Sequence, residues 1–385
     1  MHIISEQSMT GMTSPSAVTF QQNLSTYRVE IIFLQMKSII SQPVLGSFLI
    51  MSRDFFSKSF NYEHIDRDIG WRSETISKRT NDGLKLSKNI IPSPCPVCED
   101  YHEHTFIQKI YGFTYIRCSI CSLVYLKEIP NTEFLKDIYV SNQEEMEKSP
   151  GDDLISTDDF NVRMEMISTP KVEFALREAK LKTPKWVDIG CGVGDLVKAA
   201  TNLGCYAVGY DIDEREILHG QNNSSNIHCI DVNPDNAERY IGDADLISVI
   251  SVLEHVPNCV ELLKMLVKNS KNEAYYLIEV PRYNSISSLV NINFKHQVSR
   301  HMLPPNHVML FSEKSFDTML GKAGLQRVAS WYYGMDINEL FGTLLLNAEH
   351  SFIETTELKR LMNEFQAMLD RSKLCDEMLV LCKRF

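Results

Sequence analysis

The feature that most constrains the fold is residues 186–195, Trp-Val-Asp-Ile-Gly-Cys-Gly-Val-Gly-Asp, together with residues 208–211, Val-Gly-Tyr-Asp. An apolar run, three alternating glycines and a second apolar run that ends in an acid predict a strand, a tight turn, a helix and another strand. An α/β sheet built this way binds a nucleoside beyond the carboxyl ends of its strands. The spacing is Gly-x-Gly-x-Gly and not the Gly-x-Gly-x-x-Gly of dinucleotide sites, which favours a cofactor without a diphosphate.

The acid that ends the second apolar run is placed for ribose. Asp211 lies 21 residues after Gly190, about where a carboxylate at the tip of the second strand meets the ribose hydroxyls. Glycine has no Cβ and tolerates positive φ, so the backbone of the turn can approach a ligand closely.

The rest of the second half alternates between apolar runs and helical patterns, which predicts βαβ units and a parallel sheet. Strands are expected at 185–189, 205–210, 226–230, 245–250, 274–280, 326–332 and 377–383. Helices are expected at about 194–203, 213–221, 235–241, 259–269 and 312–323, the last beginning at Ser312 and ending at Gly324. The predicted fold class is therefore α/β, a Rossmann-like seven-stranded sheet with helices on both faces.

Four regions follow from the patterns along the 385 residues. Residues 1–90 form an N-terminal extension, partly disordered, without an assigned fold. Residues 91–130 form a compact cysteine-containing segment, and residues 131–180 a helical connector whose later part, 163–180, is an amphipathic helix. Residues 181–385 form the α/β domain, with a helical insertion at about 336–375.

Two cysteine pairs, Cys95/Cys98 and Cys118/Cys121, follow the pattern C-x2-C-x19-C-x2-C. This spacing is typical of zinc ribbons, and four thiolates leave no open position, so the pattern predicts a structural zinc ion. Nearby histidines as ligands, a redox pair and four unligated thiols are the alternatives. The solvent-facing side of the intervening hairpin is the expected place for His102 and His104.

Charge and cysteine usage limit the partners. The formal net charge of −11 provides no basic surplus for nucleic-acid phosphates or anionic membranes. Residues 31–51 are apolar but interrupted by Lys37 and Pro43, so no membrane span is expected. The other six cysteines sit in or beside apolar runs as buried thiols do, which favours a cytoplasmic location.

Residues 185–333 resemble a class I S-adenosylmethionine-dependent methyltransferase. Five motifs carry the resemblance in order: residues 187–194, residues 209–211, residues 229–232, residues 244–256 and residues 321–325. The resemblance implies S-adenosylmethionine as cofactor. It implies cofactor contacts from the glycine turn, the second strand's end, the adenine loop and the fourth strand's end, namely Asp188, Gly190, Cys191, Gly192, Gly194, Asp211, Ile212, Asp231, Val232, Ile250 and Ser251.

Within these contacts the roles differ. Asp211 is expected to bind the ribose diol, and Asp231 the adenine amino group with Val232 beside the ring. Asp188 orients either the turn or the methionine ammonium, or it caps the turn. We expect Cys191 to act as a small filler.

The paired cysteines resemble those of a methyltransferase subgroup with an N-terminal zinc-binding segment. That subgroup usually has glycine directly after each pair, whereas this chain has Glu99 and Ser122. Its acceptors, where assigned, are small molecules that include sugars, so the resemblance implies a small-molecule acceptor, a sugar or a nucleotide-linked sugar. The oligomeric state, the methylated atom and the acceptor itself are left open.

Residues 279–311 are the expected acceptor loop, because ligands bind beyond the carboxyl ends of the strands. Its candidate side chains are Glu279, Arg282, Tyr283, His296, Arg300, His301 and His307. His307 is favoured as a base or acceptor-orienting group, with backbone-bonded shaping of the loop as the alternative, and His255 is expected to stabilise a turn. A catalytically inactive binding protein and a nicotinamide-dependent oxidoreductase remain as other functions.

Overall fold

The computed structural model describes residues 53–56, 90–131, 157–223, 226–294, 300–346 and 356–385, with scattered positions between 77 and 87. They belong to a unit that extends from Phe48 to Phe385. The predictions for residues 1–52, including the apolar run at 31–51, lie outside the described residues. Among the helices that are described, none has the length and apolar character needed to cross a membrane.

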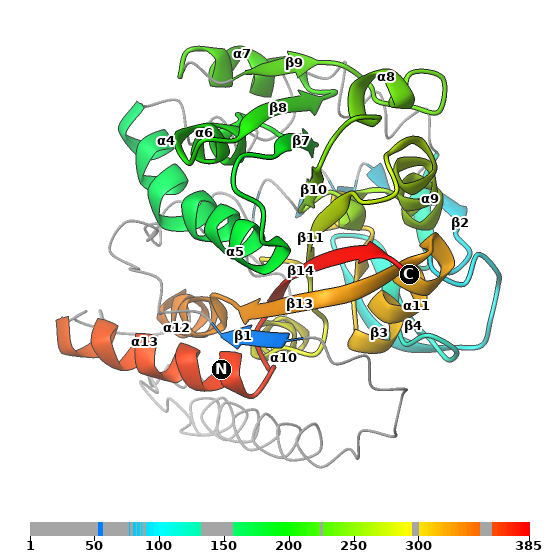
Figure 1. Cartoon of the computed structure of the whole chain (residues 1–385). Coiled ribbons are helices and arrows are strands. Elements are labelled where there is room, and N and C mark those ends of the chain that lie inside the picture. Colours follow the sequence, from blue (N-terminus) through cyan, green and yellow to red (C-terminus); the bar gives the residue numbers. More distant parts are fainter. Residues whose placement is uncertain are drawn as a thin grey trace, which may run out of the picture. The chain divides into compact units, whose positions relative to one another are not determined.

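A mixed sheet forms the centre of this unit (Figure 1). Its strands are β1 (Arg53–Phe56), β7 (Lys185–Ile189), β8 (Tyr206–Asp211), β9 (Ile227–Cys229), β10 (Leu246–Ile250), β11 (Tyr275–Pro281), β13 (Leu325–Tyr333) and β14 (Glu377–Arg384). The order is β1-β13-β14-β11-β10-β7-β8-β9, and β14 alone runs antiparallel to both neighbours within it. The seven predicted strands and the α/β class are confirmed. An eighth strand, β1, pairs with β13 and comes from the segment that the sequence left unassigned.

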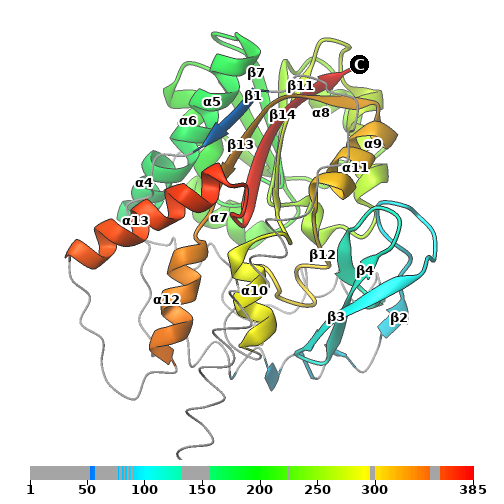
Figure 2. The same ribbon diagram turned by 90° about the horizontal axis from the view of Figure 1, so that it is seen from below.

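Alternate residues of the central strands pack on opposite faces of the sheet. Leu246 and Leu277 pack with α5 (Thr169–Ala179) and α6 (Asp195–Asn202), whereas Ile247 and Ile278 pack with α9 (Cys259–Asn269) and α11 (Glu313–Ala323). Figure 2 shows these helices on opposite sides of the sheet. Both faces are therefore covered, as the near-continuous apolar runs require.

The helices largely follow the predicted ranges. The others between the strands are α7 (Glu214–Gln221), α8 (Ala237–Ile241) and α10 (Ile286–Asn293). In α11, the Ser312 hydroxyl accepts from the Ser315 N–H, and Gly324 ends the helix in a left-handed conformation. The insertion consists of α12 (Asp336–Leu346) and α13 (Thr356–Arg371).

Two helical segments differ from the expectation. The predicted helix at 163–180 begins earlier, as α4 (Thr157–Arg163), passes through a π-helical turn at Met164–Ser168 and continues as α5. The expected acceptor loop contains α10, which is capped by Ser285, whose hydroxyl accepts from the Ser288 N–H. Ser-Ile-Ser-Ser reads as a loop in sequence, because serine competes for backbone hydrogen bonds and favours turns and caps.

The cysteine segment is joined to the α/β domain through a shared sheet. It contains β2 (Ile90–Pro92), β3 (His104–Ile110), β4 (Phe113–Cys118), β5 (Val124–Leu126) and β6 (Glu128–Pro130). Strand β12 (Met309–Leu310), near the end of the expected acceptor loop, pairs with β5 to complete the order β12-β5-β4-β3. The Leu126 N–H also donates to the Val308 carbonyl at 2.9 Å. The segment predicted at 91–130 therefore shares hydrogen bonds with the chain around residue 308.

Candidate cofactor and acceptor site

The glycine turn between β7 and α6 requires glycine at its first positions. Gly190, Gly192 and Gly194 all have positive φ, at 74°, 52° and 81°. A Cβ on Gly190 would come within 2.4 Å of Val252 Cγ2, so a side chain there meets both strain and a clash. The nearest atom to a Cβ on Gly192 would be Glu216 Oε2 at 3.9 Å, so the backbone is open on that side. The turn thus exposes bare backbone at the carboxyl end of β7.

Asp211 ends β8 directly beside this turn. Its Oδ2 accepts a hydrogen bond from Gly192 N at 2.8 Å, and its Oδ1 accepts from Asp213 N at 2.9 Å. Burial raises the pKa of the carboxyl, while these backbone donors act in the opposite direction. Ile212 beside it is 46% exposed. The carboxylate is therefore held in one orientation at the carboxyl end of β8.

Asp188 has a different environment. Its side chain is buried, and its Oδ1 accepts from the Ser248 hydroxyl at 2.5 Å, which in turn accepts from Trp186 Nε1 at 2.7 Å. Burial raises the pKa of Asp188 to about 8. The Asp188 carboxyl is therefore hydrogen-bonded within the sheet, among side chains of β7 and β10.

Cys191 is a small buried side chain next to the glycine turn. A Cβ on Gly209 of β8 would lie 2.7 Å from Cys191 Sγ, so the two positions are matched in size. Burial raises the pKa of this thiol well above its usual value, which keeps it protonated and unreactive.

The loop after β9 lies beside Asp211. The Ile230 N–H donates to the Asp211 carbonyl at 2.8 Å. The Asp231 backbone carbonyl accepts from the side-chain amides of Asn233 and Asn236. The residue itself is exposed. Half-buried Val232 packs against the core.

The carboxyl end of β10 is tied to β11 through a buried carboxylate. Ser251 has φ of 52°, and its hydroxyl donates to Glu279 Oε1 at 3.0 Å, one residue after Ile250. Lys171 Nζ lies 2.9 Å from Oε1 and 2.7 Å from Oε2 of Glu279, and the Tyr333 hydroxyl also donates to Oε2. Although burial opposes ionisation, Lys171 lowers the pKa of Glu279 below its usual value.

Lys171 and Tyr333 were missed by sequence reasoning. Lys171 is 108 residues from its partner, on a helix whose pattern indicated only an amphipathic surface. Nothing in the local sequence signals this contact.

Two histidines and a glutamate lie beyond the end of β10. His255 and His307 rings meet edge to face with centroids 4.7 Å apart. His255 Nδ1 lies 2.8 Å from the Asn306 carbonyl, so it must donate its proton there. Burial lowers the pKa of His255 to about 4, so the ring is neutral near pH 7. Glu254 next to it is buried and was not singled out from the sequence.

The loop before β12 is held from the cysteine segment. The buried Tyr115 hydroxyl donates to the His307 carbonyl at 2.6 Å, and the His307 N–H donates to the Leu303 carbonyl at 2.9 Å. His301 stacks on His307 with centroids 5.9 Å apart, and its Nε2 lies 3.3 Å from Asp376 Oδ2.

Other candidates in the acceptor loop have structural partners. Arg282 is buried and donates to the carbonyls of Lys373 and Cys375 and to Glu313. Arg300 pairs with Asp376 and Glu377. Tyr283 bonds through its backbone N–H to Phe311, and His296 lies outside the described residues.

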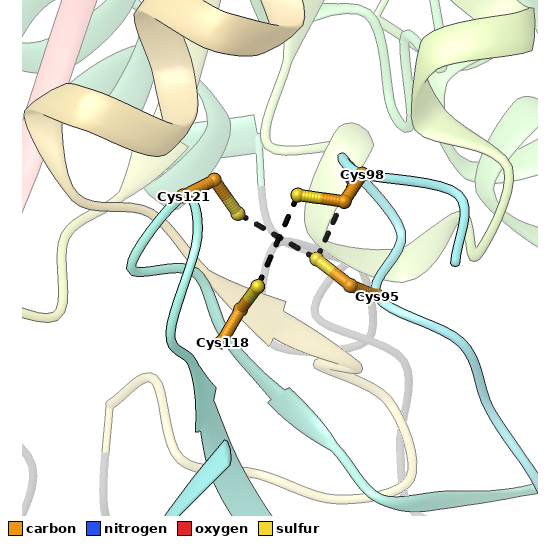
Figure 3. A group of neighbouring side chains, drawn as sticks. All are labelled: Cys95, Cys98, Cys118 and Cys121. Carbon is orange, nitrogen blue, oxygen red and sulfur yellow. Dashed lines mark hydrogen bonds between the residues drawn. The ribbon is translucent and has the colours of Figure 1, made fainter. Parts of the chain in front are cut away.

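The four paired cysteines converge on one point (Figure 3). The sulfur–sulfur distances are 3.5 Å for Cys95–Cys121 and 3.9 Å for Cys98–Cys118. Thiolates bound tetrahedrally to zinc at about 2.3 Å would be about 3.8 Å apart, so these side chains fit the ion. His102 and His104 do not belong to this group.

The residues that follow each pair, Glu99 and Ser122, both have φ of 64°. A left-handed conformation is easiest for glycine. The positions where the resembling subgroup has glycine are therefore positions where this chain adopts the left-handed conformation with a side chain.

Comparison with known proteins gives the enzyme class. Residues 163–330 match the family model described as "Methyltransferase domain". The ubiquinone biosynthesis O-methyltransferase of Hydrogenovibrio crunogenus is 24% identical over 168 residues, which are 41% of this chain and 69% of that protein.

Two solved structures show the extent of structural similarity. A SAM-dependent methyltransferase from Archaeoglobus fulgidus is 21% identical with a TM-score of 0.38, over 60% of this chain and 100% of its own. The cyclopropane synthase MmaA2 from Mycobacterium tuberculosis is 15% identical with a TM-score of 0.38, over 57% and 84% of the two chains. The family match and the curated relative identify this protein as an S-adenosylmethionine-dependent methyltransferase.

Proposed function

We propose that this protein transfers a methyl group from S-adenosylmethionine to a small-molecule acceptor, a sugar or a nucleotide-linked sugar. The observation that carries the proposal is the fixed carboxylate of Asp211 beside the open backbone of Gly192. A ribose diol that donates to a held carboxylate makes charge-assisted hydrogen bonds, which are the stronger kind.

We propose the remaining cofactor contacts as the resemblance to class I methyltransferases implies them. Gly190, Gly192 and Gly194 receive the ribose and methionine portion, and Asp231 with Val232 receives the adenine. Ile250 and Ser251 border the methionine end. Asp188 supports the turn from the sheet interior, which its buried bond to Ser248 favours over direct contact with the ammonium.

The acceptor is proposed to lie between the end of β11 and the loop at 303–307. S-adenosylmethionine supplies the methyl group as an electrophilic sulfonium, so the chain's main task is to align a nucleophile with the S–CH3 bond. Neutral imidazoles can accept a proton from a hydroxyl acceptor or orient it. His307, held by Tyr115 and in contact with neutral His255, is proposed for one of these two roles.

We propose further that Cys95, Cys98, Cys118 and Cys121 bind a structural zinc ion. Their sulfur distances suit tetrahedral coordination, and the Cys98 N–H points to Cys95 Sγ at 3.5 Å. The ion would fix the ends of β4 and β5, and β5 in turn pairs with β12 just after His307. Zinc would thus stabilise the acceptor side of the site without taking part in the chemistry.

Binding measurements separate this proposal from the other functions. Calorimetry should detect binding of S-adenosylhomocysteine and none of NADH; the reverse result would favour a nicotinamide-dependent oxidoreductase. A catalytically inactive binding protein would bind S-adenosylhomocysteine yet transfer no methyl group to any acceptor in a metabolite pool.

A further inference from the structure

One carboxylate and two imidazoles converge beyond the end of β10, apart from the four cysteines. Ligand atoms of Glu254, His255 and His307 all lie within 4.8 Å of one another. The first two are on the 3-10 turn Leu253–His255, and His307 comes from the loop before β12. The Val308 N–H donates to the Glu254 carbonyl at 2.8 Å, which ties that loop to the turn.

Glu254 is the unusual member of this group. Its side chain is 1% exposed, and among the described residues its Oε2 has no hydrogen-bond partner. A buried carboxylate of this kind costs free energy unless a cation or donor meets it.

The histidines present the complementary chemistry. Because His255 Nδ1 donates to the Asn306 carbonyl, its Nε2 carries a lone pair. A backbone carbonyl that fixes the ring in this way is the usual second contact of a metal-binding histidine. Both imidazoles are half-buried, whereas Glu254 is fully buried.

We propose that Glu254, His255 and His307 bind a divalent transition-metal ion, separate from the four-cysteine site, whose open positions take an oxygen of the methyl acceptor. Two histidines and one glutamate are a common ligand set for zinc with an open position. Ligand atoms about 2.1 Å from an ion lie about 3.4 Å apart in a tetrahedron, so small side-chain rotations would close the group. This inference rests on the proposed methyl transfer and assigns His307 the orienting role.

The consequence for the reaction is specific. A hydroxyl bound to the ion loses its proton to water more readily, because a bound divalent ion lowers the pKa of such oxygens. The oxygen then bonds to the methyl carbon as the carbon–sulfur bond breaks. That bond's electron pair stays on sulfur and gives S-adenosylhomocysteine.

The test is the metal content of the full chain. Wild type, Glu254→Gln and the control Glu261→Gln are stripped with chelator, incubated with Zn²⁺ and dialysed, and zinc per chain is measured by mass spectrometry. Glu261 is an exposed glutamate on α9. We expect wild type and Glu261→Gln to retain one equivalent more than Glu254→Gln, whatever the four cysteines hold.

A second variant, His255→Gln, keeps the test valid if Glu254→Gln does not fold. It should also lack the additional equivalent of zinc. Equal zinc content in wild type and in either folded variant would overturn the site. S-adenosylhomocysteine binding is measured on the same samples. If wild type holds the additional zinc but does not bind S-adenosylhomocysteine, the proposed methyl transfer is refuted and the metal site is still supported.

Discussion

Replacing Asp211 should weaken cofactor binding more than any other single change at the carboxyl ends of the strands. The carboxylate can accept two hydrogen bonds from a ribose diol, each worth about 1.5–3 kcal/mol when one partner is charged. Loss of both in Asp211→Ala therefore costs about 3–6 kcal/mol, or a rise in Kd of about 10²- to 10⁴-fold.

The variant Asp211→Asn refines this prediction. One amide oxygen remains to accept either from Gly192 N or from the ribose, so we expect a smaller rise in Kd, of roughly 10- to 10²-fold. It also spares the fold, because Asp211→Ala leaves the N–H groups of Gly192 and Asp213 without their acceptor. Both variants should be checked for cooperative thermal unfolding.

The assay is calorimetric titration with S-adenosylhomocysteine. Asp243→Asn is the matched control, since Asp243 is an exposed aspartate paired with Lys185. A folded Asp211→Ala that binds as tightly as the control would refute the assignment of Asp211 to the ribose.

Four other predictions test separate parts of the structure. Burial raises the pKa of Asp188 to about 8, above its unfolded value, so the native state binds one proton more than the unfolded state and the free energy of unfolding should fall as pH rises from about 4 to 8. Asp188→Asn should flatten this pH dependence in denaturant unfolding. A pH dependence equal to that of wild type would contradict the prediction. Ser122→Gly should raise Tm by about 1–3 °C, since a non-glycine residue at φ of 64° costs about 1–2 kcal/mol, whereas the control Ser119→Gly should not. Tyr115→Phe removes the 2.6 Å bond to the His307 carbonyl and should cost about 1–3 kcal/mol in chemical unfolding, with S-adenosylhomocysteine affinity unchanged; weakened cofactor binding would speak against a role confined to the acceptor side. Removing zinc with a chelator should lower Tm and expose the Cys95 and Cys121 thiols to a thiol reagent, and unchanged thiol reactivity would argue against zinc at the four cysteines.

The features predicted correctly from sequence are those encoded locally. The run at 246–250 is apolar at nearly every position because β10 is buried on both faces, and Ser312 and Gly324 carry the chemistry of helix ends. Such signals depend on neighbours within a few residues, so a single sequence reveals them.

The features that sequence did not predict depend on tertiary contacts. Glu279 meets Lys171 and Tyr333 only because α5 and β13 fold back on β11, and no local pattern records those separations. Strand β1 and the two residues of β12 also have no recognisable sequence pattern, since each is short and is defined by the strand with which it pairs. In sequence Glu254 is only one position of the motif at 244–256, and its buried Oε2 lacks a hydrogen-bond partner among the described residues only once the chain is folded.

We propose that this protein passes a methyl group from a nucleoside cofactor, bound by Asp211 and the glycine turn, to a small molecule. The direct measurement is incubation of the purified chain with methyl-labelled S-adenosylmethionine and a metabolite extract, followed by mass identification of labelled products. We expect one labelled small molecule, together with S-adenosylhomocysteine, and loss of both with Asp211→Ala. Wild-type protein that binds S-adenosylhomocysteine but labels nothing across extracts rich in sugars and nucleotide sugars would contradict it.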